Sequence, residues 1–280
     1  MKRIENRDFT GDRPLFGSDG IEIVNCTFDN GESPLKESRN VTADACLFRW
    51  KYPFWYCKNV KVKNSAFFEM ARAGIWYTEN VSLQNCTVEA PKEFRRCDCV
   101  TIRDTVFTNA AETLWQCKNV TMENVSAKGD YLAMNSENVS VDGLDLVGNY
   151  CFDGGRNIEI KNSRLISKDA FWNSENVTVR NSFISGEYLG WNSKNLTFIN
   201  CTVESLQGLC YIDGLKMINC KTLNTTLALE YSTVDVEITN KIDSVLNPSG
   251  GVIRAHEIGE LTIEPDKVDP SRTEIIITSK

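Results

Sequence analysis

Apolar and polar residues alternate over short stretches of this chain, and the alternation returns about every 19 residues. In most repeats an asparagine or glycine is followed by an aliphatic residue, a polar residue and a second apolar residue, as in 119–122 and 176–179. Alternation with a period of two is typical of a strand that buries one face. A repeat of nearly fixed length indicates a solenoid, in which each repeat packs on its neighbours.

A second asparagine follows this step by five positions in eight repeats, and a small residue usually comes next. The column contains Asn25, Asn64, Asn85, Asn124, Asn162, Asn181, Asn200 and Asn219. A stacked amide can donate to one neighbouring coil and accept from the other. The column therefore predicts an asparagine ladder at a bend of the chain.

A third column of apolar residues lies five positions before the asparagine or glycine that begins this step. Each repeat therefore holds three short strands. We therefore expect an all-β parallel β-helix, a solenoid of three sheets with about 12 coils of ~19 residues. No linker interrupts the repeats, which predicts a single domain over residues 1–280. Within it we expect an N-terminal cap or first coil at 1–19, repeat coils over 20–251 and a C-terminal cap at 252–280.

Charge and composition exclude several classes of function. The net charge is −7 and no apolar run reaches 18 residues, which argues against nucleic acid and against a membrane as partners. Eleven cysteines without a secretory signal predict reduced thiols in a cytoplasmic protein. With His256 as the only histidine and one isolated Cys97-x-Cys99 pair, we expect neither a metal site nor a cofactor.

Five of the six tryptophans share one column, four positions before the step. They are Trp55, Trp76, Trp115, Trp172 and Trp191. The column adjoins the inward apolar column, so strand alternation predicts that it faces outward. Arg95 and Asp153 occupy the same column, and burying such charges in a dry seam would be costly. The alternative is that the tryptophans cover a buried seam or an oligomer contact.

Tyrosines and charged residues run beside the tryptophans. The column seven positions before the step includes Lys92, Glu112, Tyr131, Tyr150, Asp169 and Tyr188, and Lys168 lies next to it. Flat aromatic faces suit the C–H faces of sugar rings, and Arg or Lys can hold the carboxylate of a uronic sugar. The sequence therefore predicts an oligosaccharide or polysaccharide ligand, bound by the five tryptophans with Lys92, Tyr150, Lys168 and Tyr188.

Catalytic residues are harder to assign from the columns. A glycoside hydrolase needs two carboxyl groups about 5–9.5 Å apart. Glu112 and Asp169 are three coils apart, which corresponds to roughly 14 Å at the coil spacing. The α-carbons of Asp153 and Asp169 are roughly 11 Å apart, so neither pair of acids fits. A polysaccharide lyase would use a base such as Arg95, Lys92 or Tyr131. The catalytic candidates are Arg95, Glu112, Tyr131, Asp153 and Asp169, and the alternative is a non-catalytic scaffold that binds a glycan or a protein.

Several runs in the chain resemble an uncharacterised bacterial family of domains of unknown function. They are residues 12–16, 31–38, 50–57, 71–78, 94–97, 112–115, 168–173 and 186–192. That family is similar in architecture to the pectin-lyase-like, single-stranded right-handed β-helices. The resemblance implies this fold, but it implies no reaction and no catalytic residue, because one fold serves many functions.

Overall fold

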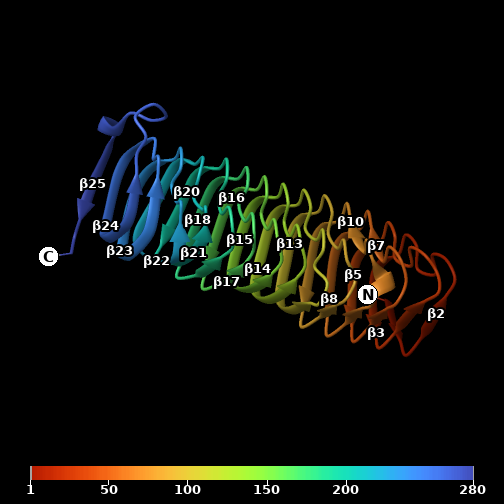
Figure 1. The fold of residues 1–280 in the computed structure, drawn as a ribbon. Coiled ribbons are helices and arrows are strands. Elements are labelled where there is room, and N and C mark those ends of the chain that lie inside the picture. The colour runs from red at the N-terminus through yellow and green to blue at the C-terminus, as the bar shows by residue number, and fades with distance from the viewer. Residues whose placement is uncertain (1, 280) are drawn as a thin grey trace. The chain divides into compact units, whose positions relative to one another are not determined.

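The computed structural model describes residues 2–279, which form β-strands with two short 3₁₀ helices. The chain divides into two compact units, unit 1 up to Asp145 and unit 2 from Leu146. Within each unit, strands of successive coils pair in parallel, typically with the residue 19 positions further on, as in Lys2↔Ile21 and Glu159↔Thr178 (Figure 1). The predicted parallel β-solenoid is confirmed. The single-domain organisation stays a prediction.

Unit 1 has two series of strands. The first series is β1 (Lys2–Glu5), β3 (Asp19–Val24), β5 (Arg39–Asp44), β8 (Lys58–Lys63), β11 (Glu79–Gln84), β13 (Asp98–Phe107) and β14 (Lys118–Lys128). The second is β2 (Asp8–Thr10), β4 (Thr27–Asp29), β6 (Leu47–Phe48), β9 (Ala66–Phe67) and β12 (Thr87–Val88), which pairs with the end of β13. Helix η1 (Glu69–Ala71) follows β9, and β15 (Glu137–Val147) contains the boundary between the units.

Unit 2 repeats this arrangement. Its first series is β16 (Arg156–Lys161), β18 (Glu175–Arg180), β20 (Lys194–Ile199), β22 (Asp213–Thr226), β23 (Thr233–Leu246), β24 (Gly250–Thr262) and β25 (Thr273–Ile277). Its second is β17 (Arg164–Ile166), β19 (Phe183–Ser185) and β21 (Thr202–Leu206), and helix η2 (Pro270–Arg272) precedes β25. Residues 2–279 make about 15 turns. This exceeds the predicted 12 because β1 and the strands after Gly250 continue the pairing beyond the asparagine repeats.

The third side of the coil contains fewer strands than the sequence predicts. Among the described residues of unit 1, only β7 (Phe54–Trp55) and β10 (Ile75–Trp76) form strands there, and isolated bridges join Trp76 to Arg95 and Arg95 to Trp115. From Phe94 onward the inward residue of this side is usually left-handed, with φ of 57° at Phe94 and 64° at Phe171. The third side is therefore mostly a turn or bend in these coils rather than a strand.

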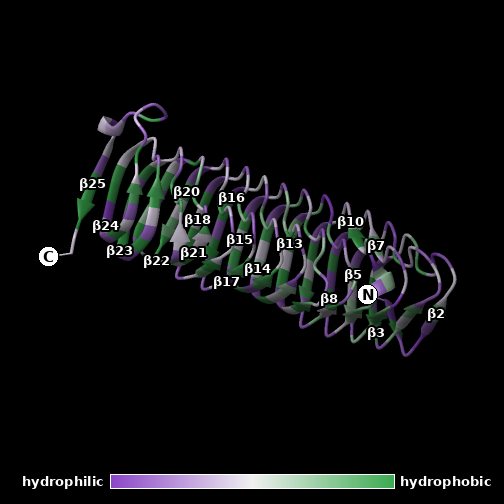
Figure 2. Cartoon of the chain, in the orientation of Figure 1, coloured by the Kyte–Doolittle hydropathy of each residue, from purple (hydrophilic) through white to green (hydrophobic). Residues whose placement is uncertain are grey.

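Side chains from all three sides fill the interior of the coils. The inward residue of the third side is fully buried in the central coils, as Phe54, Phe94 and Phe171 show. Apolar and polar residues alternate along the strands that enclose it (Figure 2). All eleven cysteines are free thiols, and ten of them are buried. These cysteines pack as small apolar residues.

Asparagines form ladders at the corners of the coil, on the surface rather than in the interior. Asn85 donates its side-chain N–H to Asn64 (2.8 Å), and Asn219 donates to Asn200 (2.8 Å). The asparagine of the repeated step forms a second ladder, in which Asn59 donates to Asn40 (2.8 Å). Both columns are left-handed, with φ near 50°. Asparagine suits these positions because it tolerates this backbone and bonds the neighbouring coil.

None of the helices within residues 2–279 has both the length and the apolar character needed to cross a membrane. Over the same range, no three His, Cys, Asp or Glu side chains gather closely enough to hold a metal ion.

Candidate functional site

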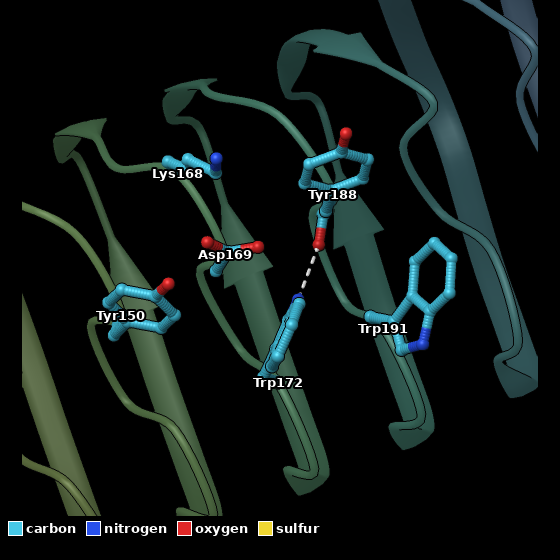
Figure 3. Close-up of a pocket in the computed structure, with 6 residues that line it drawn as sticks. All are labelled: Tyr150, Lys168, Asp169, Trp172, Tyr188 and Trp191. Carbon is cyan, nitrogen blue, oxygen red and sulfur yellow. Dashed lines mark hydrogen bonds between the residues drawn. The ribbon is translucent and has the colours of Figure 1, made fainter.

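A cavity of about 340 Å³ opens on the third side of the coils of unit 2. We call it the Trp172 pocket. It is lined by Tyr150, Lys168, Asp169, Trp172, Tyr188 and Trp191 (Figure 3). These side chains come from three successive connecting segments, which precede β16, β18 and β20. The repeat therefore brings together residues that are about 19 or 38 positions apart in the sequence.

Local backbone geometry turns the aromatic side chains outward. Phe171 is buried and left-handed, so the next residue, Trp172, projects from the coil and is only partly buried. The indole N–H of Trp172 donates to the backbone carbonyl of Tyr188 at 2.9 Å, which fixes the ring against the next coil (Figure 3). The polar edge of the ring is satisfied by the protein, so its apolar face remains for contact with a ligand.

The four aromatic rings stand at different angles around the cavity. Tyr150 is nearly perpendicular to Trp172, with ring centroids 5.9 Å apart. Tyr188 is nearly perpendicular to Trp191 at the same distance. Trp172 and Trp191 are 6.4 Å apart and tilted by 37°. The rings therefore form the walls of a pocket rather than a flat stripe.

Asp169 is the buried polar group of the pocket. Its side chain is 1% exposed, and its Oδ1 atom has no hydrogen-bond partner among the described residues. Burial raises the pKa of this carboxyl, while a hydrogen bond from Tyr150 and the charge of Lys168 oppose the rise. The nearby charges of Glu187 and Asp153 also raise this pKa. Asp169 is thus a carboxyl whose hydrogen-bonding capacity the protein only partly uses.

The other charged groups around the pocket are paired or bonded. Lys168 contacts Glu187 at 3.4 Å, and its ammonium lies 5.3 Å from the ring centroid of Tyr188. Asp153, which precedes Trp172 in the tryptophan column by one coil, accepts a hydrogen bond from Asn173 at 3.0 Å. Lys168 is exposed and therefore lies at the rim of the pocket. The carboxylate of Asp153 is held by Asn173 of the next coil.

The corresponding positions in unit 1 form a different arrangement, which we call the Arg95 cluster. It consists of Trp76, Lys92, Arg95, Glu112 and Trp115. The guanidinium of Arg95 lies between two indoles, 4.5 Å from the ring centroid of Trp76 and 4.7 Å from that of Trp115. Glu112 bonds Arg95 at 3.2 Å and Lys92 at 3.1 Å. The cations of this cluster are therefore already held by a carboxylate and by aromatic faces of the protein.

Two further candidates extend the Arg95 cluster. Trp55 stacks on Trp76 with centroids 5.1 Å apart, and Tyr131 meets Trp115 edge-on at 6.3 Å. Trp55, Trp76 and Trp115 donate their indole N–H groups to carbonyls of the following coil at 2.6–2.9 Å. The predicted site residues thus fall into two groups, one in each unit. All six residues that line the Trp172 pocket were candidates from the sequence.

Glu93 is a residue that the sequence reasoning missed. It is 1% exposed, and burial raises its pKa well above the ordinary value. Its Oε1 accepts the backbone N–H of Gly74 at 3.1 Å, and a side chain at position 74 would collide with the carboxyl group. Glu93 thereby supports the backbone just before Trp76. The sequence does contain an indication of this role. Glu93 is the one acid in a column of otherwise apolar or small residues, and the preceding repeat has Gly74 at the same position.

The chain belongs to a family described as proteins of unknown function, DUF3737, whose sequence model matches residues 2–276. Comparison with curated proteins gives no match.

Several solved structures are similar to this chain at low sequence identity. The tailspike protein of E. coli bacteriophage HK620, in complex with a pentasaccharide, is 11% identical with a TM-score of 0.51, over 92% of this chain and 62% of that chain. The surface adhesin PfbA of Streptococcus pneumoniae is 9% identical with a TM-score of 0.43, over 93% and 81%. The A-module of a mannuronan C-5 epimerase from Azotobacter vinelandii is 11% identical with a TM-score of 0.29, over 98% and 88%.

Proposed function

We propose that the protein binds an oligosaccharide and that the Trp172 pocket holds one of its sugar rings. The observation that carries this proposal is four aromatic rings around one cavity that also contains the buried carboxyl of Asp169. Ligand sites in proteins are typically concave and mostly apolar, with a few polar groups that fix orientation. The volume, about 340 Å³, lies at the lower end of the range for small-ligand pockets, about 300–1,000 Å³, and suits a ligand of one or two rings.

The chemistry of the walls favours a sugar over a purely apolar ligand. Trp172 and Trp191 offer apolar faces to the C–H face of a pyranose. The Oδ1 atom of Asp169 lacks a partner, and the exposed ammonium of Lys168 stands at the rim. A ring with hydroxyl groups on its edge can meet both kinds of surface at once, because hydroxyls donate to carboxyl oxygens and accept from ammonium.

Binding, rather than cleavage, is the activity that the geometry supports best. Glycoside hydrolysis requires two cooperating carboxyl groups, and Asp169 is the only carboxyl among the residues that line the Trp172 pocket. The second acid nearby, Asp153, is bonded to Asn173. In unit 1, Glu112 engages the cations that a lyase would use to hold a uronate, Arg95 and Lys92.

The shared fold is consistent with this proposal. The tailspike protein, here a mutant form of it, is a protein of similar fold in complex with a pentasaccharide, so a saccharide ligand is compatible with this fold. For this chain, the proposal rests on the pocket and not on that likeness, because fold alone does not determine function.

A glycan-array screen followed by calorimetry of the best ligand tests the proposal. Trp172→Ala and Trp191→Ala should each weaken binding by about 5- to 150-fold, since a large aromatic contact is worth about 1–3 kcal/mol. Trp55→Ala is the matched control, because Trp55 occupies the same column in unit 1 and should leave affinity unchanged. Absence of any glycan ligand, or full affinity in the Trp172 and Trp191 variants, would overturn the proposal.

A further inference from the structure

The Arg95 cluster and the Trp172 pocket are built from the same positions of the repeat. In each, one coil contributes two residues three positions apart, Lys92 and Arg95 in unit 1 or Tyr150 and Asp153 in unit 2. The next coil contributes an acid and a tryptophan, also three positions apart. These are Glu112 and Trp115 in unit 1, and Asp169 and Trp172 in unit 2. The two sites can therefore be compared position by position.

In unit 1 the protein supplies a cation to the tryptophan and the acid. The guanidinium of Arg95 lies 4.7 Å from the ring centroid of Trp115, and its Nη2 atom bonds Glu112 at 3.2 Å. The indole face and the carboxylate thus share one positive group. Such a group gains both cation–π attraction and a charge-assisted hydrogen bond.

In unit 2 the tryptophan and the acid are kept, but the position of Arg95 is taken by Asp153. The reversal of charge puts an acid one coil before Asp169, at the position that precedes Trp172 in the tryptophan column. The Oδ1 atom of Asp169 has no hydrogen-bond partner among the described residues. The lysine of this site, Lys168, contacts Glu187 and the ring of Tyr188 instead.

The groups that face Asp169 therefore carry a surplus of negative charge. Lys168 and Glu187 are paired at 3.4 Å and offset each other, which leaves the acids Asp153 and Asp169, and Tyr150 contributes a hydrogen bond to Asp169. An anionic sugar such as a uronate would add a further negative charge to this surface. A positively charged ligand group would reduce the repulsion between the carboxylates, and it would find aromatic faces beside it.

We propose that the Trp172 pocket recognises a positively charged nitrogen on its ligand, namely the protonated amino group of an amino sugar placed against Trp172 between Asp153 and Asp169. This inference rests on the proposed function and narrows it from saccharides in general to saccharides with a free amino group. The ammonium takes the role that the guanidinium of Arg95 has in unit 1. The sugar ring beside it contacts the remaining aromatic walls.

The affinity should depend on pH in a way that neutral sugars would not show. As the pH falls through the raised pKa of Asp169, the carboxyl becomes neutral and attraction to the ammonium weakens. As the pH rises through the pKa of the sugar amine, the ligand loses its charge. Binding of an amino sugar should therefore be strongest at intermediate pH.

Calorimetry of the full chain with three tetrasaccharides tests the inference. The probes are β-1,4-linked tetrasaccharides of glucosamine, of N-acetylglucosamine and of glucose, which differ only in the charge and size of the group at C2. We expect the glucosamine oligomer to bind about 10-fold more tightly than the other two, with an advantage that shrinks as salt is added. Asp153→Asn and Asp169→Asn should remove this advantage while Trp172→Ala weakens all three ligands.

The outcomes separate this inference from the proposed function. Equal or tighter binding of the neutral oligomers would overturn the requirement for a cation and leave saccharide binding intact. Binding of no oligomer in this test or in the glycan array would overturn both. Glu112→Gln is the matched control, because it removes the corresponding acid of unit 1 and should not change the preference for glucosamine. A change as large as that in Asp169→Asn would mean that the preference does not arise in the Trp172 pocket.

Discussion

Unit 1 places a guanidinium of its own between two indoles, whereas unit 2 carries a carboxylate at the same position of the repeat. Arg95 contacts Trp76, Trp115 and Glu112, so the charge of the guanidinium is matched within unit 1, although its Nε atom has no hydrogen-bond partner among the described residues. In unit 2 this position holds Asp153, so the tryptophan column supplies no cation to the face of Trp172 or to the carboxyl of Asp169. Changes of residue at fixed positions, Arg95 against Asp153 and Lys92 against Tyr150, can thus separate a stabilising cluster from a pocket suited to a ligand.

The largest effect on stability should come from removing the cation of unit 1. Arg95→Ala deletes two cation–π contacts and the ion pair with Glu112, and we expect unfolding to require about 2–3 kcal/mol less. Asp153→Asn, which keeps the acceptor for Asn173, should change stability by less than about 0.5 kcal/mol. Urea melts of both variants measure this difference. Equal losses would show that the two positions have the same structural role.

Replacing a tryptophan should likewise cost more stability in unit 1 than in unit 2. Trp115→Ala removes a ring that covers Arg95, so we expect a loss of about 2 kcal/mol. Trp172→Ala removes a ring that lines a cavity, and a loss of about 1 kcal/mol should follow. Thermal melts at one pH are sufficient for the comparison. A loss of 3–5 kcal/mol in Trp172→Ala would mean that this ring belongs to the core and not to a binding wall.

The asparagine ladders should contribute equally in the two units. Asn64→Ala in unit 1 and Asn200→Ala in unit 2 place alanine in a left-handed backbone and each remove two ladder hydrogen bonds, at a cost of about 1–2 kcal/mol each. The glycine variants of both positions relieve the backbone strain and should recover part of the loss. Urea melts of the four variants provide the measurement. Unequal losses in the two alanine variants would indicate that the scaffolds differ, and not only the sites.

The smallest effect should come from the buried acid of the pocket. The pKa of Asp169 is raised in the folded state, so the native protein binds this proton more tightly than the unfolded chain does. Its contribution to stability is present at low pH and is lost as the pH rises through the folded-state pKa. Asp169→Asn should therefore raise stability slightly at neutral pH and flatten this part of the pH dependence. Urea melts from pH 4 to 8 test it, and a loss at pH 7 would contradict the expectation.

Much of the architecture could be predicted from the sequence because the repeat is nearly exact. Alignment on the asparagine step placed Trp172 next to Trp191 and Tyr150 before Asp169, since residues one period apart must be neighbours in a solenoid. The geometry of the third side could not be predicted in this way. Strand alternation does not reveal that Phe94 and Phe171 adopt left-handed backbones, which turn this side into a bend.

The division of the candidates into two groups also required the structure. Glu112 and Asp169 share a column and look equivalent in the sequence. Their difference lies in which side chains reach them, because Glu112 meets Arg95 and Lys92, whereas Asp169 is buried with one oxygen unpartnered. Contacts of this kind depend on side-chain conformation across coils. Glu93 was missed for the same reason, since its partner is a backbone amide of the preceding coil.

The most direct test of the account is a crystal structure of the protein soaked with the glucosamine tetrasaccharide. We predict a sugar ring in the Trp172 pocket, with its amino nitrogen against Trp172 and within hydrogen-bond distance of a carboxyl oxygen of Asp153 or Asp169. A pocket without bound sugar at saturating ligand would contradict the account. So would a sugar bound with its amino group pointing away from both carboxyl groups.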